Sequence, residues 1–164
     1  CAEKQLTYAL RAYRRLVDDE EAVRMFIEAL EKHGPEGYRE ADAKLQLVWQ
    51  LSEDLDDKRV ITALIPFLGD HSDDIRWAVM DLLMKAHADG QLGDELISAV
   101  SGELTGILCD DSTGPRIARR AAQLLSEQEW KVTGEVTDLP SLLDEDYFID
   151  KKRYLRSRAK RTSN

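Results

Sequence analysis

The feature that most constrains this sequence is an apolar residue at nearly every third or fourth position, from Leu6 to Leu125. This spacing places apolar side chains along one face of a helix, so it predicts an α-helix wherever it continues unbroken. Glycine and proline are scarce, with 9 and 4 residues among 164, and β-branched residues rarely alternate with polar ones. We therefore expect an all-α fold. Seven helical segments are predicted, over about 6–17, 23–30, 38–49, 60–68, 75–86, 96–108 and 117–125.

Short polar segments separate the predicted helices and contain residues that end and begin helices: 33–37, 69–74, 89–94 and 110–115. Connections this short make neighbouring helices antiparallel. Acidic clusters fall at the predicted helix starts, where carboxylates cap backbone amides and meet the positive end of the helix dipole. They are Asp18 to Glu21, Asp56-Asp57, Asp73-Asp74 and Asp110-Asp111. Their spacing does not match a calcium-binding loop, and we expect no metal site.

Three of the predicted helices repeat one pattern. Tyr38, Ile75 and Ile117 are each followed seven residues later by a leucine, and they lie 37 and 42 residues apart. Separations of this size are typical of repeats that each consist of a pair of helices.

The middle copy resembles a HEAT repeat, because Pro66 falls in its first helix, Asp70 lies in its turn, and Ile75-Arg76 begins its second helix. The resemblance covers 57–88, 94–127 and 21–54. It implies a short right-handed α-solenoid of about three HEAT-like helical hairpins plus an N-terminal helix, with an extended or partly helical C-terminal tail. We expect a repeat domain over 1–138 and a docking segment with a basic tail over 139–164.

The resemblance further implies contacts between an aspartate and an arginine of successive repeats. This pattern is complete only at Asp70 and Arg76, because the third copy has Ala118 in place of the arginine and the first copy has Arg39 but a different turn. HEAT solenoids ordinarily hold another macromolecule on one face. The relatives that do chemistry include bilin lyases and alkyl-base DNA glycosylases, and none of their motifs is found here.

The helix that begins near Ile75 has a second apolar stripe, formed by Trp77, Met80 and Met84 with Asp81 beside it. One interpretation is an exposed contact for a protein partner, since tryptophan is a common hot-spot residue and methionine adapts to varied surfaces. The alternative is a central helix that is packed on two sides.

Arginines at positions 116, 119 and 120 form a basic spot in an otherwise acidic body. They could pair with carboxylates of a partner, or with this chain's own Asp144, Glu145 and Asp146.

Charge is distributed unevenly between the body and the C-terminus. The net charge is −9, yet residues 151–164 contain no acid, which leaves 16 basic and 32 acidic residues in 1–150. An acidic body attracts basic proteins and repels phosphate backbones, so we expect no nucleic-acid partner except through the tail. The basic residues of that tail are Lys151, Lys152, Arg153, Arg156, Arg158, Lys160 and Arg161.

The sequence of residues 130–136 predicts a short strand or an extended stretch that closes the last repeat. Trp130 is expected to cover the end of the core. The tail itself has three interpretations: a disordered extension, a helix along the acidic body, or a linear motif that a partner binds. Its aromatic residues, among them Tyr147, Phe148 and Tyr154, favour docking over free solvation.

No catalytic or cofactor-binding pattern stands out. The three histidines show no metal-ligand spacing, Gly102 and Gly106 fit close helix packing, and no nucleophile or phosphate-binding motif is present. Cys1 and Cys109 form neither a zinc site nor a disulfide framework, which predicts a reducing, cytoplasmic location. Cys1 leaves three origins open: a processed lipoprotein, a tag remnant or an engineered labelling site. No apolar run approaches the length of a membrane span, so we expect no membrane partner.

Together these patterns predict a non-enzymatic protein-binding module without cofactor, a scaffold, adaptor or inhibitor, that holds a partner on the second-helix face. A narrower alternative is an immunity protein that neutralises a basic toxin. The acidic charge of the body is the only feature that suggests it. The rival class is a HEAT-like enzyme or enzyme subunit of the bilin-lyase or nucleic-acid-processing kind. A fragment of a larger solenoid is a further alternative. The sequence does not indicate an oligomeric state.

Overall fold

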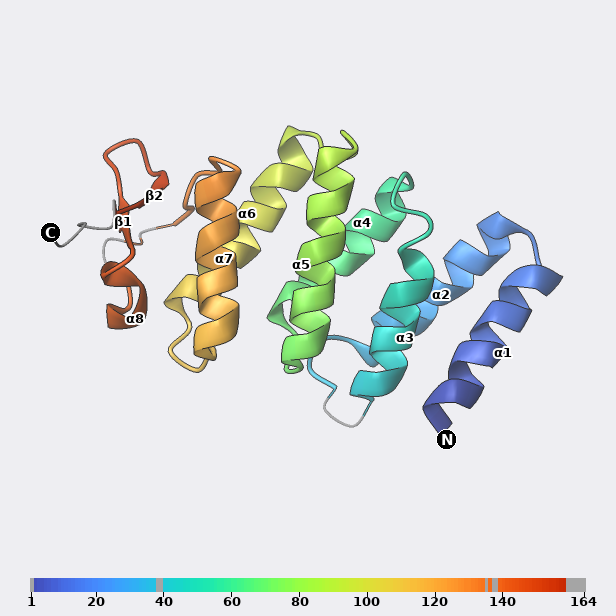
Figure 1. The fold of residues 1–164 in the computed structure, drawn as a ribbon. Coiled ribbons are helices and arrows are strands. Elements are labelled where there is room, and N and C mark those ends of the chain that lie inside the picture. The colour runs from blue at the N-terminus through green and yellow to red at the C-terminus, as the bar shows by residue number, and fades with distance from the viewer. Residues whose placement is uncertain (1, 38–39, 135, 137–138, 159–164) are drawn as a thin grey trace, which may run out of the picture. The chain divides into compact units, whose positions relative to one another are not determined.

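The computed structural model describes residues 2–37, 40–134, 136 and 139–158, and of residues 2–4 only the backbone. These residues are mostly helical, with one short antiparallel pair of strands (Figure 1), which confirms the all-α prediction. The chain divides into two compact units between Gly93 and Asp94. The predicted domain boundary at 138 stays a prediction.

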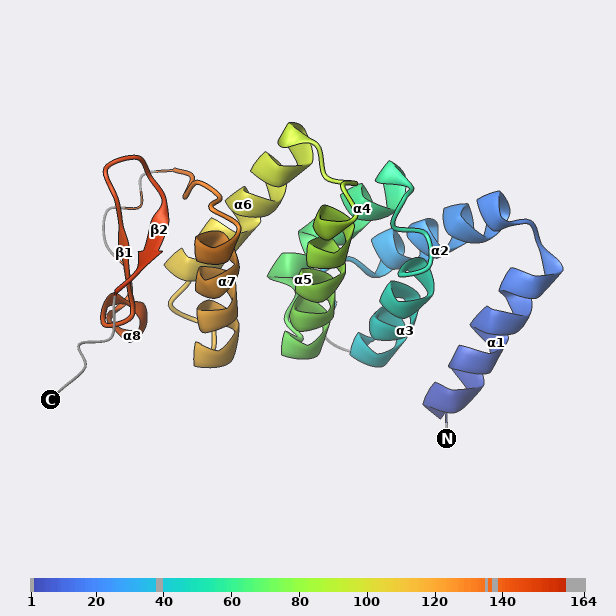
Figure 2. The same ribbon diagram turned by 45° about the horizontal axis from the view of Figure 1, so that its top comes forward.

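The first unit consists of helices stacked in two rows. Figures 1 and 2 show α1, α3 and α5 side by side, with α2 and α4 forming the second row. The elements are α1 (Ala2–Leu16), α2 (Asp19–His33), α3 (Ala41–Leu51), α4 (Lys58–Leu64), the 3-10 helix η1 (Ile65–Gly69) and α5 (Asp73–Ala88). All five helices that the periodicity predicts before residue 90 are present. The fourth changes to 3-10 geometry at Pro66, because proline has no amide hydrogen for an α-helical bond.

Aspartates begin two of these helices, as the acidic clusters predict. The Glu21 amide donates to Asp18 Oδ1 at 2.7 Å at the start of α2, and the Arg59 amide donates to Asp57 Oδ1 at 2.8 Å at the start of α4. Each bond satisfies a backbone amide that has no partner within its helix. The caps therefore fix where α2 and α4 start.

Helix α1 has fewer buried side chains than the other helices of the first unit. From Gln5 to Leu16 none of its side chains is buried, and Tyr8 and Leu16 are 71% and 83% exposed. Tyr13 contacts Phe26 of α2, with 6.1 Å between ring centroids. Polar contacts also hold α1: Thr7 donates to Gln46 at 2.7 Å, and Arg14 binds both carboxylate oxygens of Asp54 at 2.6 Å.

A buried ion pair joins α3 to the turn before α5. Lys44 and Asp70 are 0% and 1% exposed, and Lys44 Nζ lies 2.5 Å from Asp70 Oδ2. Lys44 also donates to the Gly34 carbonyl at 3.2 Å, and Asp70 accepts from the Ser72 amide at 2.8 Å. One pair of side chains thus fixes α3, the loop after α2 and the turn before α5.

The HEAT resemblance implies a contact between Asp70 and an arginine, whereas the structure pairs Asp70 with Lys44. The carboxylate of Asp70 binds Lys44 of α3, while Arg76 Nε donates to the Leu68 carbonyl at 3.1 Å. The expected arginine of the first copy, Arg39, lies outside the described residues. The structure therefore shows Asp70 in a buried inter-helix contact with a lysine as its partner.

The second unit contains α6 (Asp94–Cys109), α7 (Pro115–Glu127), a short α8 (Ser141–Asp144) and a hairpin of β1 (Tyr147–Ile149) and β2 (Leu155–Ser157). The long helices were predicted, and the hairpin was not. Asp150 stabilises its turn by accepting from the amides of Lys152 and Tyr154, and Leu155 is fully buried. The turn contains no glycine, and Arg153 adopts the left-handed conformation instead, with φ of 72°.

Small and hydroxyl side chains of α6 hold the extended segment that follows α7. Ser101 donates to the Lys131 carbonyl, and the Thr133 amide donates to Thr105 at 3.2 Å. Lys131 forms a β-bridge with Tyr154, and Trp130 is buried, as the sequence predicts for this segment. Close helix packing at Gly106 is not observed, because a Cβ there would meet no atom within 4 Å.

The buried ion pair gives a stability prediction. Lys44→Met leaves the Asp70 carboxylate buried without its cation, so we expect a loss of about 3–5 kcal/mol in the free energy of unfolding, measured with urea. Lys44→Met/Asp70→Asn removes both charges and keeps an oxygen for the Ser72 amide, so the double variant should be more stable than the single one. The exposed control Lys85→Met should change stability by less than about 0.5 kcal/mol. Equal losses in the single and double variants would contradict this account.

Candidate functional site

The outer side of α5 presents part of the predicted contact surface. Trp77 and Met84 are half-buried and Asp81 is exposed, whereas Met80 is only 1% exposed. A buried Met80 does not reach a partner, and its burial is what packing on two sides predicts for this position. The residues of α5 that remain accessible are Trp77, Asp81 and Met84.

A second tryptophan extends this surface onto α3. Trp49 is 47% exposed, and Asp42 and Leu45 precede it at helical spacing, one exposed and one half-buried. Because α3 packs beside α5, and Trp49 and Trp77 lie on the accessible stripes of these two helices, we assign the two tryptophans to one face of the first unit. We call the set Asp42, Leu45, Trp49, Trp77, Asp81 and Met84 the tryptophan face.

Trp49 was not named as a partner contact in the sequence analysis. The residues of α3 that face the core include Leu47 and Leu51, which are both buried. Together with the buried Lys44, they turn the accessible stripe of α3 towards Asp42 and Trp49. The spacing of Asp42, Leu45 and Trp49 was the signal that could have revealed it.

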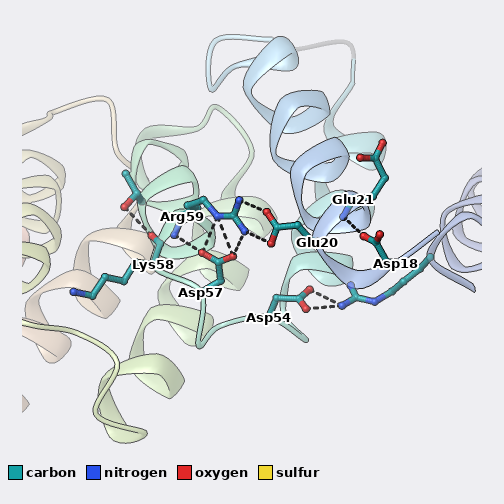
Figure 3. Close-up of polar contacts among 9 residues, drawn as sticks. Asp18, Glu20, Glu21, Asp54, Asp57, Lys58 and Arg59 are labelled. Atoms are coloured by element: carbon teal, nitrogen blue, oxygen red, sulfur yellow. Dashed lines mark hydrogen bonds and ion pairs between the residues drawn. The ribbon is translucent and has the colours of Figure 1, made fainter.

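Acidic residues gather in two turns at one edge of the same unit. The turn between α1 and α2 and the turn between α3 and α4 bring together Asp18, Asp19, Glu20, Glu21, Glu53, Asp54, Asp56 and Asp57. Figure 3 shows Arg59 between the two groups, bound to both oxygens of Glu20 at 2.7 and 2.8 Å and to Asp57 at 2.6 Å. Hydrogen bonds from Arg59 hold the pKa of Glu20 and the pKa of Asp57 below their usual values. We call this set the acidic edge.

The predicted basic spot on α7 is partly accessible. Arg116 and Arg119 are exposed, while Arg120 is half-buried and donates to Gln123 at 3.2 Å. Of the acids proposed as internal partners, Asp144 binds Arg158 at 3.1 Å. Whether the α7 arginines bind a partner stays a prediction.

Two of the four tail residues singled out as basic contacts take part in the fold. The guanidinium of Arg153 donates to the carbonyls of Val132, Thr133, Gly134 and Val136. Arg156 binds Glu129 at 2.6 Å and Asp150 at 3.2 Å. Lys151 and Lys152 are exposed in the hairpin turn, and Lys160 and Arg161 lie outside the described residues.

The described residues contain no group of three or more His, Cys, Asp or Glu side chains that could hold a metal ion. His33 contacts Glu40, His71 lies 3.1 Å from Glu36, and the Cys109 thiol is exposed. No helix in this part of the chain is long and apolar enough to cross a bilayer. Comparisons with protein-family models, curated proteins and solved structures find no match to this chain.

The Arg59 contacts predict a pH-dependent contribution to stability. Because folding lowers the pKa of Glu20 and of Asp57 from ordinary values of 4.5 and 3.8, their contribution is complete above these values and is lost as the pH falls through the folded pKa values. Arg59→Gln should therefore be less stable than the wild type at pH 7, and the difference should shrink between about pH 5 and pH 3. Urea unfolding at a series of pH values measures it.

Lys58→Gln is the matched control, because the Lys58 ammonium points away from Glu20 and Asp57 (Figure 3). A difference between Arg59→Gln and the wild type that stays constant down to pH 3 would contradict the assignment.

The Arg153 contacts predict local loosening of the hairpin when they are removed. Arg153→Ala removes four hydrogen bonds from one charged group, so amide hydrogen exchange in β1, β2 and Val132 should become at least about tenfold faster. Lys152→Ala, an exposed neighbour in the same turn, should leave these rates unchanged. Equal acceleration in both variants would show that the turn, rather than the guanidinium, sets the stability.

Proposed function

We propose that this chain is a HEAT-like helical-repeat protein that binds another protein on the tryptophan face. Three successive helix pairs support a repeat, namely α2 with α3, α4 and η1 with α5, and α6 with α7. A helical-repeat protein buries one stripe of each helix against its neighbours and uses the remaining face for binding. The proposal is for a scaffold, adaptor or inhibitor without chemistry of its own.

The observation that carries the proposal is a pair of accessible tryptophans on adjacent helices. Trp49 is the most exposed tryptophan of the described residues, and Trp77 on α5 extends the same surface. Large aromatic side chains dominate the binding energy of protein interfaces when they enter a pocket of the partner. Half-buried Met84 and Leu45 supply adaptable apolar area around them.

The charge of this unit defines the chemistry of the partner. Asp42 and Asp81 lie on the tryptophan face, and part of the acidic edge follows the C-terminal end of α3. Complementary charges accelerate association and exclude partners of the wrong sign. We therefore expect a partner whose contact surface contains an apolar pocket bordered by lysine or arginine.

Affinity capture with matched variants tests the proposal. A cell lysate is passed over three immobilised forms of the purified chain: the wild type, Trp49→Ala/Trp77→Ala and the control Tyr8→Ala/Leu16→Ala. The control removes exposed apolar side chains from α1 instead of from the tryptophan face. A protein held by the wild type and the control, and lost from the tryptophan variant, is the expected result. For that protein, titration calorimetry should give a Kd at least about 30-fold higher for the tryptophan variant, the effect of losing about 2 kcal/mol. Equal capture by all three forms would overturn the proposed surface.

A second candidate function is favoured by the acidic edge: an immunity protein that inhibits a basic toxin. Eight carboxylates in two adjacent turns, with Arg14 and Arg59 among them, create a negative field suited to rapid capture of a cationic protein. Association with such a target should slow steeply as salt increases, and the target should lose its activity in the complex. A captured partner that is acidic would exclude this candidate.

A further inference from the structure

Helix α1 has an apolar surface that the first unit does not cover. Tyr8 and Leu16 are 71% and 83% exposed, and Ala9 and Ala12 are exposed between them. These residues recur at helical spacing, so they share one side of the helix. We call Tyr8, Ala9, Ala12 and Leu16 the α1 stripe. The terminal helix of a helical-repeat protein ordinarily has a polar outer face, and α1 does not.

The stacking of the unit indicates what could cover the α1 stripe. Helix α3 packs against α2, which precedes it, and α5 packs against η1 in the same way. Helix α1 contacts α3 and α2, which both follow it. Figures 1 and 2 show α1 at the end of its row, with α3 on one side and no described helix on the other. The place beside α1 that corresponds to that of α2 beside α3 is therefore open.

Half-buried residues of α2 border the same open place. Met25 and Ala29 each lie two residues from Ile27, and residues two apart on a helix point in nearly opposite directions. Ile27 lines a groove together with Thr62 and Ala63 of α4, so Met25 and Ala29 lie on the side of α2 away from α4. An occupant of the open place would contact both α1 and this side of α2.

The charges around the open place are positive. Arg11 and Arg15 are exposed beside the α1 stripe, and Lys32 is exposed one turn after Ala29. None of these three cations forms an ion pair with a described residue, although acidic residues outnumber basic ones in the first unit. Carboxylates of an occupant would complement them, and such pairs select the partner more than they add affinity.

We propose that the α1 stripe binds an amphipathic α-helix of another protein, with aspartate or glutamate on both sides of its apolar stripe. Ala9 and Ala12 let the two helix backbones approach closely, while Tyr8 and Leu16 supply apolar area on either side. Two antiparallel copies of α1 would fit less well, because a two-fold axis would bring the arginines of both copies to the same flank. The surface is separate from the tryptophan face, so this proposal does not rest on the proposed function.

Two synthetic peptides test the proposal. The probe is a labelled helix of about three heptads with leucine at positions a and d and glutamate at positions e and g, and the control peptide has lysine at e and g. Like charges keep each peptide monomeric. Fluorescence anisotropy with the wild-type chain should give a Kd on the order of 10 μM for the glutamate peptide, and a Kd at least about tenfold higher for the lysine peptide.

Variants locate the binding on α1. Tyr8→Ala/Leu16→Ala should raise the Kd of the glutamate peptide at least about tenfold, because it removes the two large apolar side chains of the α1 stripe. Arg11→Glu/Arg15→Glu should reverse the preference, so that the lysine peptide binds more tightly than the glutamate peptide. A gain of binding cannot result from unfolding. Trp49→Ala/Trp77→Ala should leave both Kd values unchanged, which separates this test from that of the tryptophan face.

Three results would overturn the proposal. The first is no binding of the glutamate peptide at about 1 mM. The second is equal binding of the two peptides to the wild-type chain. The third is a wild-type dimer in sedimentation equilibrium that Tyr8→Ala/Leu16→Ala converts to a monomer, because it would assign the α1 stripe to a second copy of this chain.

Discussion

The first unit depends on the buried contact between Lys44 and Asp70. Two opposite charges without access to water are expensive to place in a core, and they are tolerated only when each has further partners. Here the Gly34 carbonyl and the Ser72 amide supply them, so three separate parts of the chain meet at one point. The contact also sets the rotation of α3, and that rotation brings Trp49 to the surface.

Helical periodicity and capping were sufficient to predict the seven long helices, because each depends on residues close together in sequence. Asp18 and Asp57 act where their positions before apolar runs predict. What could not be predicted depends on contacts between distant residues. The accessible side of α3 follows from a lysine that binds an aspartate 26 positions away, and the hairpin follows from Arg153 binding carbonyls near residue 134. No local pattern distinguishes these two cations from the solvated ones.

Several charged side chains bind partners within the fold. Arg59 joins two acidic turns, Arg153 holds the segment before the hairpin, and Arg156 binds Glu129. The acidic residues remain the larger group on the accessible surface of the first unit. In the proposed function, the acidic charge sets the class of partner, and the accessible tryptophans set where that partner binds.

The lack of buried side chains in α1 affects how the protein behaves in stored samples. This helix holds no fully buried side chain from Gln5 onward, and its polar attachments are to Gln46 of α3 and to Asp54 in the turn after α3. Its detachment would uncover the ring of Phe26 in α2, which contacts Tyr13 and is buried in the folded unit. A partly opened molecule of this kind exposes apolar surface without unfolding, which is the usual first step of aggregation in stored samples. Shelf life at high concentration would then be governed by the packing of α1 rather than by the strength of the core.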